Sequence, residues 1–551
     1  MRVFRHLAGG LGSLLLAALP ARADPPLRLI PAQADLLAEV KQPRRLVETL
    51  LNLDLVRQLQ EFPPVQEQLR STRARRFYQL LAYFEKELGR PWPELLDGLA
   101  GGGVALGLVF QSLHEDNKQF GITPTASLLV IQGKDEKLMR KFVRLGLEVF
   151  EQELARQDLL KERPVKAPYQ GVETIRAGKD LHIAVAGAAL LVSNTEKGLQ
   201  FGLDLHLGRE KKSIAGVAAL GEAAKLLPPD CLARVWLNME TVRRGPGVKD
   251  LYKARPRANG GLTVLAGGLL DVLGRAPYVC AGLHRDRDGF LATVRVPRGR
   301  EGMAEPERAL HLPPPGQPGT RPLLTPKGTL FTDSFYLDVS RVWQDRARLF
   351  PAKQVTDFED FDKKTAPFLA GTRLSKLLSR AGPYHRIVVV THRKTAYKTE
   401  PRQHIPAFAY VLELREPEAF GRSMEAVLRG AALLLTFQVK LELVEETHNG
   451  CKIVGYRFPE GAALKGDIND VRFNFSPCFV RVGNQFVWCS TVELCRELVD
   501  LLRKEDRGAG GDLATARARV PSTGAAEALQ RLRDPLIIQV ILDQAVSPKE
   551  A

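Results

Sequence analysis

LLAEV at residues 36–40 and FYLDV at residues 335–339 are apolar stretches that each end in an acid and a valine. A stretch with helical spacing follows each of them, at 44–53 and at 341–350. The same local pattern in both parts of a 551-residue chain indicates that the second half repeats the architecture of the first.

Other stretches support this repeat, because they occur in the same order in both halves. The further pairs are 104–110 with 387–391, 127–132 with 407–414, 171–177 with 450–458, 183–193 with 479–489, and 233–238 with 537–543. Thr195 and Thr491 stand at matching expected helix starts, where a hydroxyl can cap free N–H groups. Strands that follow one another without a crossover helix pair antiparallel. We therefore predict an α+β fold of two similar halves, each with curved antiparallel sheet packed by helices on one face.

A proline-rich segment separates the two halves. Proline lacks a donor N–H and fixes φ, which favours a linker over a helix or a strand. The sequence predicts a first half at 24–296, a linker at 297–328 and a second half at 329–551. Just before the linker, the turn residues Asp286 to Gly289 lie between two apolar stretches and predict a β-hairpin that closes the first half.

Residues 1–23 have the three parts of a signal peptide. Arg2 and Arg5 give a positive start, Leu7 to Leu19 is an uncharged apolar run, and Ala21-Arg22-Ala23 is a small-x-small cleavage site. The apolar run is shorter than the about 20 residues that cross a bilayer, and no later segment reaches that length. We expect a periplasmic or extracellular protein that begins at Asp24 and has no transmembrane segment after cleavage.

The chain is basic, with 79 Lys and Arg against 63 Asp and Glu and a formal net charge of +16. The densest basic clusters, at 70–76 and 249–257, lack the interleaved aromatic residues that single-strand nucleic-acid binders use. Solvated helix faces and loops are favoured for both clusters, and surface attraction to anionic polymers or lipid headgroups stays open. We predict no specific nucleic-acid partner.

All six cysteines lie in the part of the chain beyond residue 230. They are Cys231, Cys280, Cys451, Cys478, Cys489 and Cys495. None forms a C-x-x-C pair, so a zinc ribbon or a thioredoxin-like redox site is not supported. Most are expected to be small buried hydrophobic residues, and their disulfide pairing is left open.

Three groups of residues invite a cofactor or metal interpretation, and none is typical of one. Gly101-Gly102-Gly103 precedes an apolar strand, which favours a turn over a phosphate cradle. His385, His392 and His404 could converge on a metal, but solvated or capping histidines are favoured. Asp467 to Asp470 lacks the glycine and distal glutamate of a calcium loop. We predict no cofactor and no metal ligand.

Glu39, Asn238, Asp338 and Asp543 recur at the ends of the four similar strands. They are the best candidates for function on pattern alone. Capping of a following helix or turn is favoured, because a polar side chain there offsets free N–H groups and the helix dipole. No residue is predicted to be catalytic.

The chain resembles an uncharacterised family of secreted bacterial proteins that is classed only as a domain of unknown function. The resemblance rests on the start Pro31-Ala32-x-Ala34-Asp35, on the glycine-rich entry into a strand at 101–108, and on the repeated strand–acid–helix unit. It implies export and a repeated α+β fold. It implies nothing about a substrate.

The sequence predicts a non-enzymatic exported protein that binds a protein, an envelope polymer or a lipid. Two alternatives stay open. One is an unrecognised enzyme with a site between the halves, which a deep pocket lined by titratable groups would favour. The other is a lipid or lipoprotein carrier, which a continuous apolar cavity would favour.

Overall fold

The computed structural model describes residues 26–61, 63–111, 123–157, 163–245, 248, 252, 259–286, 289–369, 371–391, 394–436, 439, 441–461, 464, 466–505 and 513–527. The expected signal peptide at 1–23 and the expected strand at 537–543 lie outside these residues. The chain forms two compact units. The first contains residues 1–253 and 272–299, and the second contains residues 254–271 and 300–551.

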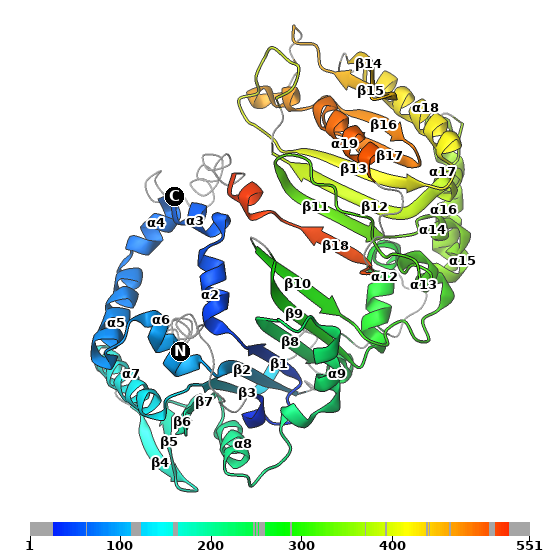
Figure 1. The fold of residues 1–551 in the computed structure, drawn as a ribbon. Coiled ribbons are helices and arrows are strands. Elements are labelled where there is room, and N and C mark those ends of the chain that lie inside the picture. The colour runs from blue at the N-terminus through cyan, green and yellow to red at the C-terminus, as the bar shows by residue number, and fades with distance from the viewer. Residues whose placement is uncertain are drawn as a thin grey trace. The chain divides into compact units, whose positions relative to one another are not determined.

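The first unit is built on a ten-stranded sheet in the order β10-β9-β8-β1-β2-β3-β7-β6-β5-β4 (Figure 1). Its strands are β1 (Leu36–Val40), β2 (Gly103–Gln111), β3 (Thr123–Gln132), β4 (Val165–Tyr169), β5 (Val172–Ala177), β6 (Leu181–Ala186), β7 (Ala189–Ser193), β8 (Ala233–Asn238), β9 (Tyr278–Asp286) and β10 (Gly289–Arg295). Every neighbouring pair is antiparallel. The expected closing hairpin is confirmed, since Asp286 of β9 pairs with Gly289 of β10.

The helices of the first unit cover both faces of this sheet. The longer ones are α2 (Pro43–Leu51), α3 (Asp54–Glu61), α4 (Pro63–Arg70), α5 (Thr72–Leu88), α6 (Trp92–Ala100), α7 (Glu136–Arg156), α8 (Glu196–His206) and α9 (Ala218–Leu226). On β3, Leu128 packs in one core cluster with Leu199 of α8. Ile131 lies three residues further along β3 and so on its opposite face, where it packs in another cluster with Leu95 of α6 and Phe142 of α7.

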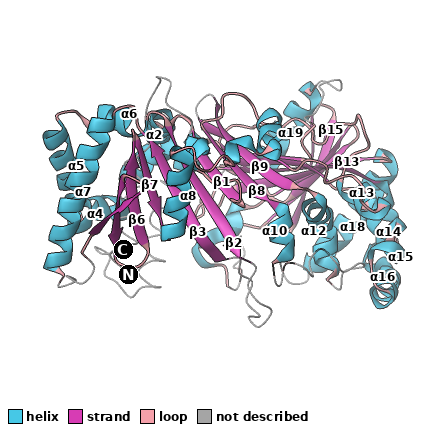
Figure 2. Cartoon of the chain, turned by 90° about the horizontal axis from the view of Figure 1, so that it is seen from below, coloured by secondary structure: helices cyan, strands magenta, loops and turns pink. Residues whose placement is uncertain are grey.

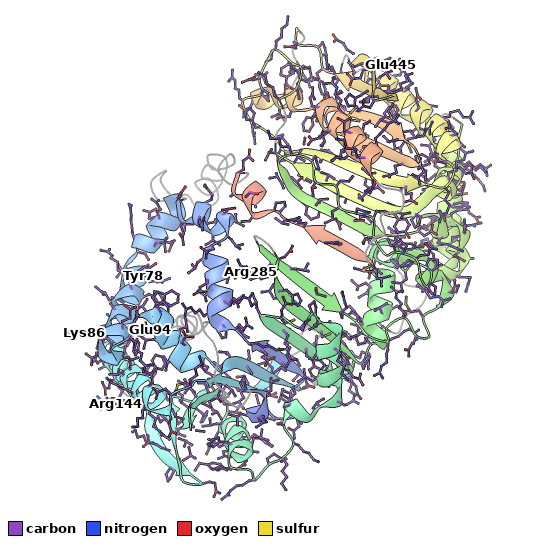
Figure 3. The ribbon with its side chains drawn as sticks, viewed as in Figure 1. Tyr78, Lys86, Glu94, Arg144, Arg285 and Glu445 are labelled. Carbon is purple, nitrogen blue, oxygen red and sulfur yellow. The ribbon has the colours of Figure 1, made fainter. Side chains whose placement is uncertain are left out.

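Helices α5 and α7 show how an amphipathic pair is oriented on the sheet. Phe84 of α5 contacts Phe142 of α7 on the buried side, with ring centroids 5.1 Å apart. Tyr78, Lys86 and Arg144 lie on the solvent-exposed sides of the same helices (Figure 3). The apolar stripe of each helix thus faces the sheet and the polar stripe faces water.

The second unit is built on an eight-stranded sheet in the order β14-β15-β16-β17-β13-β12-β11-β18. Its strands are β11 (Thr329–Tyr336), β12 (Ala381–Val390), β13 (Ala407–Leu414), β14 (Glu442–His448), β15 (Cys451–Arg457), β16 (Cys478–Val482), β17 (Gln485–Cys489) and β18 (Ala516–Arg519). All of its pairings are antiparallel. At the β14 edge, Glu445 pairs with Arg429 and Lys452 (Figure 3).

Helices also cover both faces of the second sheet. The described ones include α12 (Gly260–Arg275), most of which belongs to this unit, α13 (Glu305–His311), α14 (Ser340–Gln344), α15 (Arg346–Leu349), α16 (Ala352–Thr365), α17 (Leu374–Arg380), α18 (Pro417–Thr436) and α19 (Val492–Lys504). On β13, Val411 packs with Leu498 of α19. Leu412 packs in a different cluster with Leu377 of α17 and Phe420 of α18.

The predicted α+β class with two antiparallel sheets is confirmed, but the expectation of helices on one face is wrong. Figure 2 shows helices along both sides of the strands. The reason is visible in β3, where Leu128-Leu129-Val130-Ile131 is apolar at every position. A strand with one wet face alternates apolar and polar residues, whereas a continuous apolar run indicates burial on both faces.

Seven strands have the same order in the two units. β1-β2-β3-β7-β6-β5-β4 in the first corresponds to β11-β12-β13-β17-β16-β15-β14 in the second. Thr195 and Thr491 cap α8 and α19, as the sequence predicts, by accepting hydrogen bonds from Gly198 N at 3.1 Å and Leu494 N at 3.3 Å. The repeat therefore extends to single hydrogen bonds.

The edge of the second sheet and the proline-rich segment bring two differences. β18, at Ala516–Arg519, pairs with β11 where β8 pairs with β1 in the first unit. The expected counterpart of β8 was 537–543, which is outside the described residues. The segment 297–328, expected to be a linker, contains the short helix α13 (Glu305–His311).

No helix of the described chain is both long enough and apolar enough to cross a membrane.

Candidate functional site

A basic pocket of about 560 Å³ lies beside α17 in the second unit. It is lined by Trp343, Gly371, Thr372, Arg373, Ser375, Lys376, Ser379, Arg380 and Ser423. Trp343 comes from α14 and Ser423 from α18, and the others come from α17 and the loop before it. Three lining side chains are cationic, and these nine residues include no carboxylate. Glu416 pairs with one of the three cations, Arg380, so the remaining positive excess favours an anionic ligand.

Arg380 is the most firmly held cation of the pocket. Its side chain is 17% exposed. The guanidinium donates to Ser423 Oγ at 2.8 Å and to the carbonyl oxygen of Ala419 at 3.3 Å, both on α18. Glu416 lies 3.5 Å from its Nε. These contacts fix the orientation of the guanidinium group in the absence of a ligand, so the Arg380 side chain loses little conformational freedom on binding.

The start of α17 is fixed by a buried acid from α16. Asp362 is 2% exposed, and its carboxylate accepts hydrogen bonds from Ser375 N and Ser375 Oγ, both at 2.8 Å. Ser379 Oγ donates to the carbonyl oxygen of Lys376 at 2.9 Å. The two serine hydroxyl protons are therefore engaged within the protein. The exposed side chains of Arg373 and Lys376 remain at the mouth of the pocket.

Trp343 forms a flat apolar wall. The Arg346 guanidinium lies 4.5 Å from the centroid of its ring, and Arg346 also pairs with Glu359 at 2.8 Å. This cation–π contact and ion pair hold the indole in place. The pocket can thus offer positive charge, N–H donors and one aromatic surface to a ligand.

The four recurring polar residues are not equivalent in the structure. Asn238 is the N-cap of α10 (Met239–Arg244), because its Oδ1 accepts from Glu240 N at 3.0 Å. Asp338 accepts from Ser340 N at 3.2 Å and pairs with Arg415 at 2.7 Å. Asn238 fits the predicted capping role. Asp338 lies one residue before Val339, the N-cap of α14, so it is not the cap itself, although it accepts from the free N–H of Ser340.

Glu39 does not cap a helix, so that part of the prediction is wrong. It lies within β1, and its carboxylate pairs with Arg234 directly opposite on β8. The side chains of Glu39 and Arg234 are 6% and 12% exposed. Strand register makes Ser334, not Asp338, the counterpart of Glu39 in the second unit. Asp543 lies outside the described residues.

The histidines do not converge on a metal in the described structure. His385 lies in β12, where Nδ1 is 2.5 Å from Tyr410 Oη and Nε2 is 2.7 Å from the carbonyl oxygen of Leu337. Burial lowers the pKa of His385 and raises that of Tyr410 to about 12. His404 lies in a separate pocket of about 150 Å³. His392 is outside the described residues.

The two loop candidates are turns. Gly102 N donates to the carbonyl oxygen of Gln132 at 2.7 Å, and Gly103 has a φ of +103°, which suits glycine at the entry into β2. Asp467 accepts a hydrogen bond from Arg472 N at 3.2 Å and pairs with the Arg472 side chain. The oxygens of Asp467 are therefore used to fix a local bend.

Three cysteines form a cluster that the sequence analysis missed. Cys478 on β16 lies opposite Cys489 on β17, and Cys495 comes from the first turns of α19. Their sulfur atoms all lie within 4.8 Å of one another, and all three side chains are buried. Burial raises the pKa of Cys478 and Cys489, whereas hydrogen bonds with these two thiols lower the pKa of Cys495.

Both sites have a sequence signal that is visible in retrospect. Lys376 and Arg380 are four residues apart, which places them on one face of α17, and Arg373 is the residue just before this helix. Cys478 and Cys489 are equally far from the turn at Gly483-Asn484, so a two-residue hairpin must set them opposite each other. The C-x-x-C criterion cannot detect a cluster that is assembled across strands.

Comparisons of this chain with protein-family models, with curated proteins and with solved structures found no match. The resemblance to an uncharacterised secreted family is therefore carried forward as a hypothesis only. The site geometry alone supports the functional proposal that follows.

Proposed function

We propose that this protein is an exported binding protein that holds an anionic group, phosphate or carboxylate, of a cell-envelope component. The observation that carries the proposal is the pocket beside α17, where Arg373, Lys376 and Arg380 line a volume of about 560 Å³. A pocket of this size accepts one small group or the end of a polymer.

The form of the three cations supports recognition of an oxyanion. Arg380 is partly buried, α18 holds its Nη1 and Glu416 lies at its Nε, so a charge-assisted hydrogen bond to phosphate or carboxylate falls to Nη2. Arg373 and Lys376 are exposed at the mouth and add attraction at longer range. Trp343 would give a sugar ring or another flat group a surface on which to pack.

The lining favours binding over the two alternatives. The nine lining residues include no His, Cys, Asp or Glu, which are the side chains that most often supply a general base or a metal ligand. Asp362 accepts a hydrogen bond from the Ser375 hydroxyl and fixes the start of α17, so this serine has a structural role. An acyl chain would need a continuous apolar lining, and Trp343 is the one large apolar side chain among the nine residues that line this pocket.

The test is isothermal titration calorimetry of the mature protein with inorganic phosphate and with D-glucuronate, with glucose as the neutral comparison. We expect saturable binding of at least one anion, weakened by added salt, and no binding of glucose. Arg373→Glu/Lys376→Glu should weaken the affinity at least tenfold, which corresponds to about 1.4 kcal/mol. Both side chains are exposed, so the melting temperature should stay the same.

Arg73→Glu/Arg75→Glu is the matched control, because it makes the same change in net charge on the exposed face of α5 in the first unit. This variant should bind like the unmodified protein. An equal loss of affinity in both double variants would show that the net charge of the protein, and not the pocket, determines binding. Absence of saturable binding of either anion would reject the pocket as an anion site.

A further inference from the structure

The cysteine cluster of the second unit is a set of three sulfur atoms from three different elements. Cys478 and Cys489 are cross-strand neighbours on β16 and β17, and Cys495 of α19 packs onto them. The sulfur atoms lie within 4.8 Å of one another and none is in a disulfide. The side chains are at most 1% exposed.

The fold itself does not require sulfur at these places. The same strand register in the first unit sets His182 opposite Ser193, and the matching position on α8 is Leu199. All three of these side chains are buried as well, at 7%, 2% and 2% exposed. One architecture therefore packs either a histidine, a serine and a leucine or three cysteines. The cysteines call for a reason beyond packing.

The chemistry of the donor set restricts what the cluster can hold. Thiolates select soft ions. Structural zinc takes four ligands, and among the described residues no fourth Cys, His, Asp or Glu joins this cluster. Ions that accept three sulfur ligands fit better, and trivalent arsenic and Cu(I) are of this kind.

The surroundings favour an adduct with little charge. The neighbours in this core cluster are apolar, with Val480, Val487 and Leu498 among them. Burial of net charge in such a wall is costly. Arsenite meets this condition, because As(OH)3 and three thiols give As(S–Cys)3 and three waters. Three As–O bonds break, three As–S bonds form, each thiol proton leaves in water, and no atom changes its oxidation state.

We propose that Cys478, Cys489 and Cys495 form a buried three-sulfur site for a soft, three-coordinate metal or metalloid ion. The site is independent of the anion pocket beside α17. The shared chemistry is thiolate coordination without oxygen or nitrogen ligands. Arsenite and Cu(I) are the two probes that distinguish a metalloid from a metal.

The experiment uses native mass spectrometry of the full chain under reducing conditions, with each probe supplied separately. The probe is added to the folded protein and, in parallel, during refolding from denaturant, so that slow entry into a buried site does not hide binding. We expect one ion per chain. The probe that binds identifies the class of ion.

Cys489→Ser and Cys495→Leu copy residues that the first unit already tolerates at the same positions, Ser193 and Leu199. Each should weaken binding at least tenfold while circular dichroism shows a folded protein. Cys451→Ala, a buried cysteine of the same core outside the cluster, should leave binding unchanged. The proposal is overturned by no binding of either probe on both routes, by binding that survives in the two cluster variants, or by a Cys478–Cys489 disulfide in the protein isolated from its source.

Discussion

The two units have residues of opposite size at the same position of the fold, near the end of α6 in the first unit and of α17 in the second. After β3, Lys134 N donates to the carbonyl oxygen of Gly98 on α6 at 2.8 Å. After β13, Arg415 N donates to the carbonyl oxygen of Arg380 on α17 at 2.9 Å. Gly98 and Arg380 are therefore structural counterparts, and one is the smallest residue while the other is among the largest.

The helix that packs against each of them compensates for this difference in size. A Cβ atom at Gly98 would lie 2.3 Å from Leu138 Cδ2 of α7. In the second unit the matching residue of α18 is Ala419, whose carbonyl oxygen accepts from the Arg380 guanidinium. A large and a small residue have exchanged places across the helix pair, which keeps the interface filled and moves a charge into it.

The charge on the neighbouring turn is also reversed. One helical turn before Gly98 and Arg380 lie Glu94 and Lys376, respectively. Asp97 of α6 pairs with Arg44 of α2 at 2.9 Å, so the acids of the first unit are partly neutralised by a neighbouring helix. The comparison teaches that a duplicated scaffold keeps its backbone hydrogen bonds while one copy gains a basic pocket.

The largest expected effect concerns the buried Glu39–Arg234 ion pair of the first unit, because Ser334 stands at the Glu39 position in the second. Glu39→Ala removes the partner of Arg234, whose side chain is 12% exposed, and leaves a buried charge unpaired. We expect a loss of about 3–5 kcal/mol in unfolding free energy. Urea unfolding, with hydrogen exchange to assign the loss to peptides of the first unit, measures it.

Glu48→Ala is the control, because Glu48 pairs with Arg44 across exposed side chains of 50% and 42%. It should cost no more than about 1 kcal/mol. A cost for Glu39→Ala within the about 0.5–2 kcal/mol of a lost helix cap would contradict the cross-strand interpretation and favour the capping role predicted from sequence.

A smaller effect tests the exchange of large and small residues. Gly98→Ala forces a methyl group toward Leu138 and should cost about 1–3 kcal/mol by overpacking. Leu138 is buried, so Leu138→Ala alone should cost about 2–5 kcal/mol. The double variant should cost less than the sum of the two, because the second change makes room for the first.

Additive costs in this double-mutant cycle would show that the two residues do not share space. Gly146→Ala is a suitable control, since a Cβ atom at Gly146 of α7 meets nothing within 4 Å. Ala also has a higher helix propensity than Gly, so this variant should be neutral or slightly stabilising.

Sequence pattern was sufficient for the repeated order of strands and helices, because apolar periodicity and the paired threonine caps are local signals. It failed where two distant segments decide the outcome. Glu39 and Asp338 look alike along the chain, yet strand register places one within a sheet and the other beyond a strand end. Whether one or both faces of a strand are buried depends on which helices pack against it. These helices come from distant parts of the chain, so the sequence of the strand alone does not show which faces they cover.

The candidate sites were missed for the same physical reason. The basic pocket draws Trp343 and Ser423 from helices that are distant in sequence from α17. The cysteine cluster needs a hairpin and a helix to bring its three sulfur atoms together. Local spacing reports neighbours on one element, and both sites depend on contacts between elements.

The smallest expected effect is a pH dependence that belongs to the second unit. His385 is a counterpart of Val104 by strand register, so only one sheet carries a titratable group at this buried position. Burial lowers the pKa of His385 below its ordinary value. Its Nε2–H donates to the carbonyl oxygen of Leu337 and its Nδ1 accepts from Tyr410 Oη, and these roles require the neutral ring.

The sign of the effect follows from proton linkage. The unfolded chain takes up the proton at the ordinary histidine pKa of about 6.5, whereas the folded chain resists it until a lower pH. The stability contributed by neutral His385 is therefore present above about pH 6.5 and is lost as the pH falls from there toward the folded-state pKa.

His385→Gln retains a donor and an acceptor but cannot titrate, so its unfolding free energy should fall less than that of the unmodified protein between pH 7.5 and pH 5.5. Urea unfolding at several pH values, beside the exposed His206→Gln control, measures the difference in slope. Identical slopes for His385→Gln and the unmodified protein would mean that the ring is protonated equally in the folded and unfolded chain, and the contrast with Val104 would then have no consequence for pH.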